Sequence, residues 1–350
     1  MAHFFRRSID FMGVRNWAFG FSALVVVASL GVLAVRGLNY GLDFSGGTVI
    51  ELQFAAPVSA EQVRRELETC GFHNGVVQTF GTDSDLLIRL PPQNRAAQAA
   101  LAKGPCRIAP ASGADATAPA AGAPGADGSA QAPGVHREED LGKIVAARLR
   151  GVEHVPFTLE RSEFVGPAVG AELKEQGGLA MLAAIALVLI YVLFRFTFKL
   201  AVGAVVALLH DPIITLGAFA LFQWDFDLSV LAAVLAVMGY SINDSIVVAD
   251  RVRENFRLMR RETPVEVVNI SINQTLDRTI MTSVMTLLTM LALLVFGGEM
   301  TRNFAIAMVI GIVVGTYSSI YISATLALII GLNRNDLMIV PKENAADGRP

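Results

Sequence analysis

The stretch LSVLAAVLAVMGYSINDSIVV, residues 228–248, is an apolar run long enough to cross a lipid bilayer as one helix. It contains a single carboxylate, Asp244. An ionisable side chain at bilayer depth is costly unless it faces protein or a water-filled path. The next apolar run begins beside a base, Arg278. An acid and a base in neighbouring spans indicate a protein that handles protons or other ions.

The composition of the whole chain is that of a polytopic membrane protein. Of its 350 residues, 53% are hydrophobic and only 17% are charged, and the mean hydropathy is +0.52. These values exclude a soluble domain and a disordered chain. The net charge of -3 provides no basic surplus for binding nucleic acid. Because no metal-ligand spacing, phosphate loop or nucleophile motif occurs, we expect no metal, no cofactor and no enzyme activity.

Six apolar segments have about the length that a spanning helix needs. They are residues 17–35, 177–194, 200–222, 228–249, 276–296 and 304–331. Lysine and arginine gather in the N-terminus (1–16), in the loop 195–199, in the stretch 250–275 and in the tail 332–350. The positive-inside rule therefore predicts that both termini are cytoplasmic. The stretch 250–275 is amphipathic, and we expect either a helix on the anionic inner leaflet or a docking surface for a cytosolic partner.

The long connection between the first two spans, residues 36–176, then lies outside the cytoplasm. Alternating and helical patterns predict the element order βαββαβ there, which is typical of a small ferredoxin-like α+β domain. The expected strands are 48–54, 76–80, 85–90 and 155–164, and the expected helices are 59–70 and 138–150.

One segment of this outer region cannot bury a core. Residues 104–134 are reduced to alanine, glycine, proline and serine, so we predict a disordered insertion. The only cysteines, Cys70 and Cys106, both fall on the oxidising side of the membrane. A disulfide between them and two unlinked thiols are both compatible with this placement.

Asp244 and Arg278 lie at similar depth. At 1.5 Å per residue, Asp244 is about 24 Å and Arg278 about 27 Å from the outer ends of their helices. An ion pair, or a contact exchanged during a transport cycle, is therefore geometrically reasonable. The alternatives are a static structural ion pair for Asp244 and snorkelling of Arg278 to the headgroups. Asp277 is the neighbouring acid that would pair statically with Arg278.

Other polar residues accompany the acid. Asn243 and Ser245 flank Asp244 and are placed to hold water, and Tyr240 lies one turn earlier on the same face. Asp211 is about 16 Å into its own helix, close to the midplane. Its role stays open between ion conduction and a hydrogen bond that packs helices.

Two glycines of the last span, Gly311 and Gly315, have the small-xxx-small spacing that favours close packing of helices.

Six motifs along the chain follow one another in a specific order. They are GLDFSGGT (41–48), EFVGPAVGAEL (163–173), HDPIITLG (210–217), GYSINDSIVVADRVREN (239–255), QTLDRT (274–279) and GTYSSIYIS (315–323). Together they resemble the SecF family of bacterial protein-translocation subunits. The resemblance draws attention to motif residues outside the apolar runs: Asp43, Gly46, Gly47, Arg251, Glu254 and Asn255.

The resemblance implies a function. SecF proteins form half of a twelve-helix, RND-like bundle with SecD in the bacterial inner membrane. It implies association with the SecYEG channel and YajC, and export of preproteins by the proton motive force after the ATP-driven SecA step. It assigns the coupling acid and base to Asp244 and Arg278. An RND-type half-transporter for a small molecule and a passive subunit that stabilises the translocon are the alternatives.

The sequence leaves several properties open. These are the choice between H⁺ and Na⁺, the amplitude of any movement of the outer domain, and whether this subunit itself contacts preprotein.

Overall fold

The computed structural model describes residues 9–70, 72, 75–80, 82–91, 140–149 and 155–337. The predicted disordered insertion, residues 104–134, lies outside the described residues. The chain divides into two compact units, one of Met1–Tyr40 with Glu175–Pro350 and the other of Gly41–Lys174.

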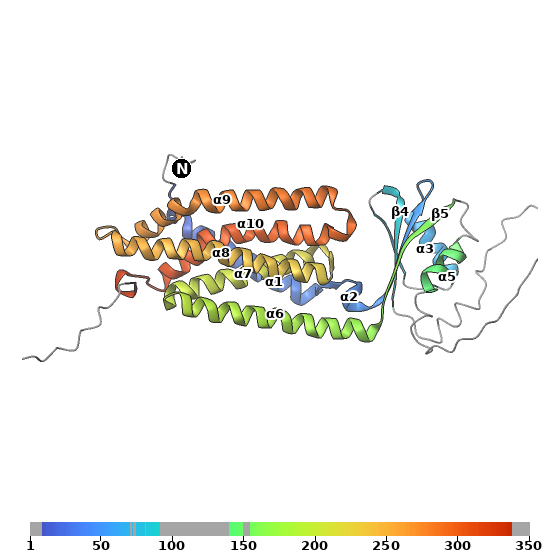
Figure 1. The fold of residues 1–350 in the computed structure, drawn as a ribbon, viewed down its shortest axis with the longest axis horizontal. Helices are drawn as coiled ribbons and strands as arrows, with labels where there is room; N and C mark the ends of the chain where they lie inside the picture. Colours follow the sequence, from blue (N-terminus) through green and yellow to red (C-terminus); the bar gives the residue numbers. More distant parts are fainter. Residues whose placement is uncertain are drawn as a thin grey trace, which may run out of the picture. The chain divides into compact units, whose positions relative to one another are not determined.

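The first unit is built from long helices (Figure 1). Among the described residues, six helices are long and apolar enough to cross a membrane, as the sequence predicts. They are α1 (Arg15–Arg36), α6 (Pro167–Arg195), α7 (Phe198–Phe222), α8 (Leu228–Leu258), α9 (Pro264–Phe296) and α10 (Glu299–Ile329).

Three of these helices form the centre of the bundle. In their most apolar spans, 50% of α7, 56% of α8 and 56% of α10 is buried, against 11% of α1, 6% of α6 and 11% of α9. The outer faces of α1, α6 and α9 are therefore free for lipid or for another protein.

The helices extend beyond the apolar runs from which they were predicted. The stretch 250–275 is divided between two helices, because residues up to Leu258 continue α8 and residues from Pro264 open α9. Its expected role, on the inner leaflet or as a docking surface, stays a prediction. The break between α8 and α9 ends at Thr263, which forms a capping box with Glu266 and is followed by a proline at the first helical position. Similarly, α6 begins at Pro167, ahead of the apolar run that starts near residue 177.

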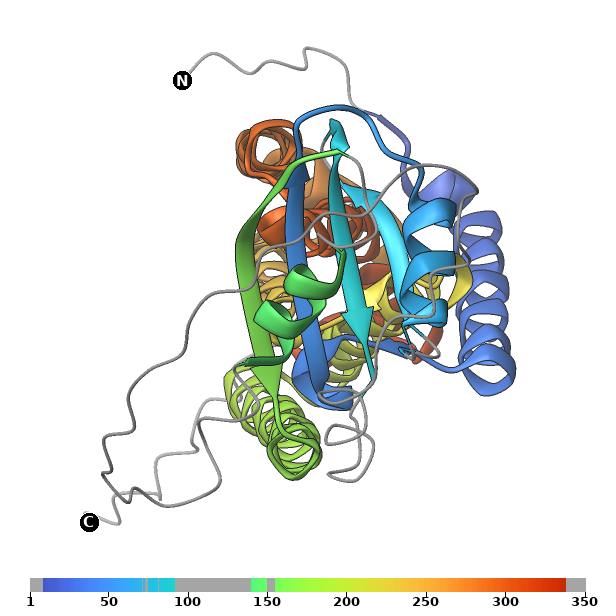
Figure 2. The ribbon, with the colours of Figure 1, turned by 90° about the vertical axis from the view of Figure 1, so that its right-hand side faces the viewer.

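The second unit is a small α+β domain. Its strands β2 (Gly47–Phe54), β3 (Val76–Phe80), β4 (Thr82–Leu90) and β5 (Phe157–Val165) form an antiparallel sheet in the order β3-β4-β2-β5. Helices α3 (Ala60–Thr69) and α5 (Asp140–Leu149) cover one face of this sheet (Figure 2). Ile50, Leu52 and Phe54 alternate along β2 toward the helices and form the core with Val63 and Leu149. The order βαββαβ is the predicted ferredoxin-like one.

Cys70 lies at the edge of this core with 7% of its surface exposed, and it is disulfide-bonded. The only other cysteine of the sequence, Cys106, lies outside the described residues.

A short parallel pairing joins two segments of the helical unit. Strand β1 (Asn39–Tyr40) pairs with β6 (Asp225–Phe226), and Asn39 Nδ2 donates to Asp225 Oδ1 at 2.8 Å. The segment that follows α1 is therefore tied to the connection between α7 and α8. The sequence patterns do not predict this contact, because neither segment is long enough to show a strand period.

Candidate ion-coupling site in the helical bundle

Asp244 is inside the bundle because it belongs to the core face of α8. The helix starts at the N-cap Asp227, whose side chain accepts from the Val230 amide. Val237, Ser241, Asp244 and Val248 follow at steps of four, three and four, and all are buried. This spacing places the carboxylate on the same stripe as apolar core residues. Only 3% of Asp244 is exposed.

Asp244 has a buried carboxylate oxygen without a hydrogen-bond partner among the described residues. Among the described residues, Asp244 Oδ2, Ser245 Oγ and Thr279 Oγ1 are all buried and unpartnered. Thr279 lies on α9, which packs against α8. Buried polar groups are nearly always paired in proteins, so orphans of this kind call for a functional explanation. A carboxylate oxygen without a donor is free to accept a proton.

Arg278 lies beside Thr279 on α9, at the surface of this chain. It interacts electrostatically with Asp244. Within the part of the chain that the structure describes, however, no ion pair joins Asp244 to Arg278 or to any other base. Asp277, the predicted static partner of the arginine, is half-buried. The geometry is thus a carboxylate under the influence of a guanidinium that does not clamp it.

The residues expected to support Asp244 separate into two groups. Asn243 is exposed whereas Asp244 is buried, because adjacent helical residues point about 100° apart. The structure therefore does not bring Asn243 into the buried site. The Tyr240 hydroxyl donates to Ser283 Oγ on α9 at 3.0 Å, and Ser283 shares a 2.7 Å hydrogen bond with Thr316 on α10. Tyr240 thereby connects the three helices one turn before the acid.

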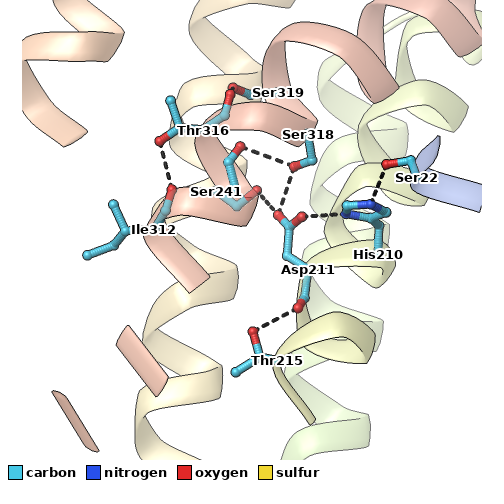
Figure 3. Close-up of polar contacts among 10 residues, drawn as sticks. Ser22, His210, Asp211, Thr215, Ser241, Ile312, Thr316, Ser318 and Ser319 are labelled. Atoms are coloured by element: carbon cyan, nitrogen blue, oxygen red, sulfur yellow. Dashed lines mark hydrogen bonds and ion pairs between the residues drawn. The ribbon is translucent and has the colours of Figure 1, made fainter. Parts of the chain in front are cut away.

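Asp211 lies in a different environment, on α7 (Figure 3). The side chain is 0% exposed and accepts hydrogen bonds from His210 Nδ1 at 2.8 Å, from Ser318 Oγ at 3.0 Å and from Ser241 Oγ. His210 Nε2 shares a 2.8 Å hydrogen bond with Ser22 Oγ on α1. One carboxylate therefore links residues of α7, α8 and α10 directly, and α1 through the imidazole.

Helix α10 passes close to its neighbours at two glycines. A Cβ atom at Gly311 would lie 2.2 Å from Val237 Cγ2. At Gly315 it would lie 3.2 Å from Ser241 Cβ and 3.4 Å from Asp211 Oδ2. Any larger residue at position 311 would force α10 away from α8, and position 315 leaves room for the Asp211 hydrogen bonds.

The glycine motif of the α+β unit is explained by its backbone. Gly46 and Gly47 adopt φ angles of +69° and +123°, which L-residues rarely adopt. A Cβ at Gly47 would also lie 2.4 Å from the Leu90 carbonyl oxygen. Asp43 belongs to the four-residue helix α2 (Leu42–Ser45) just before these glycines. These motif residues belong to the second unit and not to the helical bundle.

The motif residues at the end of α8 hold helices together. Asn255 is 2% exposed, and its Nδ2 donates to Ser271 Oγ at 2.8 Å and to Gln274 Oε1 at 2.9 Å on α9. Arg251 and Glu254 form an exposed pair at 2.9 Å. Asn255 therefore satisfies buried polar groups between α8 and α9, and the ion pair adds little.

Sequence reasoning did not single out several of the hydroxyl side chains described above, among them Ser22, Ser241, Ser318 and Thr279. A signal for them exists, since a hydroxyl on the core stripe of an apolar helix needs a partner across the interface. Such a hydroxyl predicts that a polar contact exists, but the sequence does not show which residue is the partner.

The fold and this site define a class of protein. It is a polytopic membrane protein with a small α+β domain inserted after its first helix and a buried acid in the bundle. Residues 144–333 match the C-terminal family model of the protein export membrane proteins SecD and SecF, and residues 31–58 match the SecD/SecF GG motif. The chain belongs to the SecD/SecF family of protein-export membrane proteins.

Curated relatives match the chain over almost its whole length. It is 43% identical over 344 residues to "Protein translocase subunit SecF" of Pseudomonas aeruginosa, covering 98% of each chain. It is 40% identical over 342 residues to the protein of the same name from Escherichia coli O157:H7, covering 97% of this chain and 94% of the relative.

Solved structures of SecDF share the fold. The crystal structure of SecDF, described as a translocon-associated membrane protein, from Thermus thermophilus has a TM-score of 0.73 and 35% identity. A structure of SecDF in a super-membrane-facing form has a TM-score of 0.62 and 36% identity. Each comparison covers 93% of this chain but only 39% of the SecDF chain. The chain therefore corresponds to one part of that longer polypeptide.

Proposed function

We propose that this chain pairs with SecD and couples movement of protons through its bundle to preprotein export across the bacterial inner membrane. Membership of the SecD/SecF family supports the role in export, and its likeness to part of SecDF supports the pairing. The observation that carries the coupling is the state of Asp244, which is buried, has an unpartnered carboxylate oxygen and forms no ion pair within the described residues.

Arg278 supplies the second part of the mechanism. Its guanidinium keeps its charge at all relevant pH values, so it acts as a movable counter-charge and not as a proton carrier. If the guanidinium approaches and retreats, the proton affinity of Asp244 changes with it. One charge that crosses the membrane releases about 2.3 kcal/mol per 100 mV, which is enough to bias a conformational equilibrium.

The remaining partners follow from the family resemblance. We propose that the SecYEG channel and YajC associate with the SecD-bound chain, that SecA acts before it, and that the preprotein is its cargo. We also propose cytoplasmic termini, supported by the arginines of residues 251–261 that follow the apolar part of α8.

The test uses inner-membrane vesicles that contain this chain, its SecD partner and the translocon. Proton flux and completion of preprotein transit are measured under an imposed pH gradient. Asp244→Asn should reduce both to the level found without a gradient. Asp250→Asn is the matched control: it lies on the same helix, but its carboxylate is partly exposed and paired with Arg195 at 2.6 Å and Arg253 at 3.2 Å. This control should retain flux and transit.

Normal flux and transit with Asp244→Asn, in vesicles where SecD pairing is intact, would refute the proposal. Transit that responds to a sodium gradient and not to a proton gradient would replace the proton by Na⁺ as the coupling ion.

A further inference from the structure

We infer that Asp211 is a positioning residue for Asp244: its carboxylate holds α7, α8 and α10 in the arrangement that keeps Asp244 buried and unpaired. This inference rests on the proposed function, because positioning matters only if Asp244 carries the coupling.

The first step of the argument is the link from Asp211 to the helix of the coupling acid. Asp211 accepts from Ser241 Oγ on α8, and Ser241 precedes Asp244 by three residues. Three residues correspond to about 4.5 Å along the axis, which is less than one turn. A rotation or slide of α8 that displaces Asp244 therefore has to break the bond between Ser241 and Asp211.

The second step is the fixed position of the carboxylate itself. Ser318 of α10 donates to Asp211 Oδ2, and the absence of a side chain at Gly315 leaves room for this contact. The Ser318 and Ser241 side chains are 0% and 1% exposed, so water does not replace a lost bond. Breaking the Ser241 bond leaves a buried hydroxyl without another partner among the described residues, whereas Ser318 Oγ still has Gly315 O of its own helix at 3.1 Å. The bond between Ser241 and Asp211 is therefore the costlier of the two to break.

The third step is the chain of hydrogen bonds from Ser22 through His210 to Asp211 (Figure 3). Its connectivity matches that of a serine-hydrolase triad. Ser22, however, lies inside α1, where the backbone N–H groups are used by the helix and cannot form an oxyanion hole. The chain therefore orients the imidazole toward Asp211 and anchors α1, most of whose apolar span is exposed.

The experiment compares two adjacent serines of α10 in the vesicles described above. Ser318→Ala removes a donor to Asp211, whereas Ser319→Ala removes a buried hydroxyl that donates only to Thr316 O of its own helix at 3.0 Å. Loss of one hydrogen bond to a charged group corresponds to about a tenfold effect. We expect about a tenfold loss of preprotein-coupled proton flux for Ser318→Ala and for Asp211→Asn, and wild-type flux for Ser319→Ala.

A spectroscopic signature separates positioning from general loss of structure. In infrared difference spectra, the protonated-carboxyl band that disappears with Asp244→Asn reports the surroundings of Asp244. This band should be displaced in Ser318→Ala and Asp211→Asn and unchanged in Ser319→Ala. An unchanged band together with wild-type flux in Ser318→Ala and Asp211→Asn would overturn the inference. If Asp244→Asn itself retains flux, the proposed function fails, while the band position still tests the positioning.

Discussion

The bundle contains two buried acids in neighbouring core helices, and their surroundings are opposite. Asp211 on α7 has three side-chain donors, from His210, Ser241 and Ser318, and is 0% exposed. Asp244 on α8 is 3% exposed and has a carboxylate oxygen without any donor among the described residues. The two acids sit in similar apolar sequence, so the sequence around each one does not explain the contrast.

Under the proposed function, this difference distinguishes an acid that holds helices together from an acid that exchanges a charge. A carboxylate that accepts three buried hydrogen bonds is expensive to remove, because buried donors such as the Ser241 hydroxyl lose their partner. A carboxylate oxygen that accepts no hydrogen bond can be protonated without breaking one. Asp211 is therefore suited to fix the helices and Asp244 to exchange a charge, although both are acids inside the same bundle.

The largest effect that tests this comparison is on stability. Asp211→Ala removes the acceptor of the Ser241 hydroxyl and of His210 Nδ1, and each buried group left unpaired costs about 1–3 kcal/mol, about 2–6 kcal/mol together. Asp244→Ala should be close to neutral, because it removes a buried group with an unpartnered oxygen. Unfolding free energies of the two variants in detergent micelles provide the measurement. Equal destabilisation by the two changes would remove the distinction between the two acids.

The next effect concerns the close approach of α10 to α8. Gly311→Ala places a Cβ about 2.2 Å from the stiff side chain of Val237, and overpacking of this kind costs about 1–3 kcal/mol. The matched control is Gly239→Ala on α8, where nothing lies within 4 Å of the added Cβ. This control should be neutral or should stabilise by about 0.5 kcal/mol. Equal unfolding free energies for the two variants would mean that α10 and α8 are less tightly packed at Gly311 than the structure shows.

A third acid, outside the spans, shows what a partly exposed partner contributes. Asp336 in the 3₁₀ turn Arg334–Asp336 accepts from Lys199 Nζ at 2.8 Å, and this hydrogen bond holds the pKa of Asp336 below its usual value. A lowered pKa in the folded state means that the contribution is complete above the unfolded value of about 3.9 and is lost as the pH falls through the folded value. Because about a quarter of each side chain is exposed, we expect at most about 1 kcal/mol.

The stability difference between the wild type and Asp336→Asn, followed from pH 7 downward, checks this expectation. The difference should vanish at the acidic end. A difference that persists there would mean that the carboxylate acts through packing and not through its charge.

The smallest expected stability effect is that of Arg278→Gln. Since no ion pair joins Arg278 to Asp244 within the described residues, the free energy of unfolding should change by less than about 0.5 kcal/mol. Gradient-dependent transit of preprotein should nevertheless be lost. Unfolding in micelles and transit in vesicles are measured on the same preparation. A loss of stability above about 2 kcal/mol would indicate a static ion pair between Arg278 and Asp244. Asp244 would then be a carboxylate with a fixed partner, as Asp211 is.

Much of the architecture could be predicted from the sequence by itself. Six spans, the βαββαβ order and the strand at Val76–Phe80 follow from the length of apolar runs and from local alternation. Asp244 and Arg278 stood out for an equally local reason, the cost of a charge within an apolar run. Such properties depend on residues within one or two turns, which a single sequence displays directly.

The surroundings of the two acids were decided only by the tertiary structure. The partners of the His210–Asp211 pair come from positions 188 residues away at Ser22 and 107 residues away at Ser318. Periodicity within a helix shows which face is buried, but it does not show which hydroxyl lies across the interface. The same holds for Asn243, whose exposure depends on the direction in which α8 faces its neighbours. Whether a buried carboxylate is satisfied or open is a property of several helices packed together, and no segment of the chain contains that information alone.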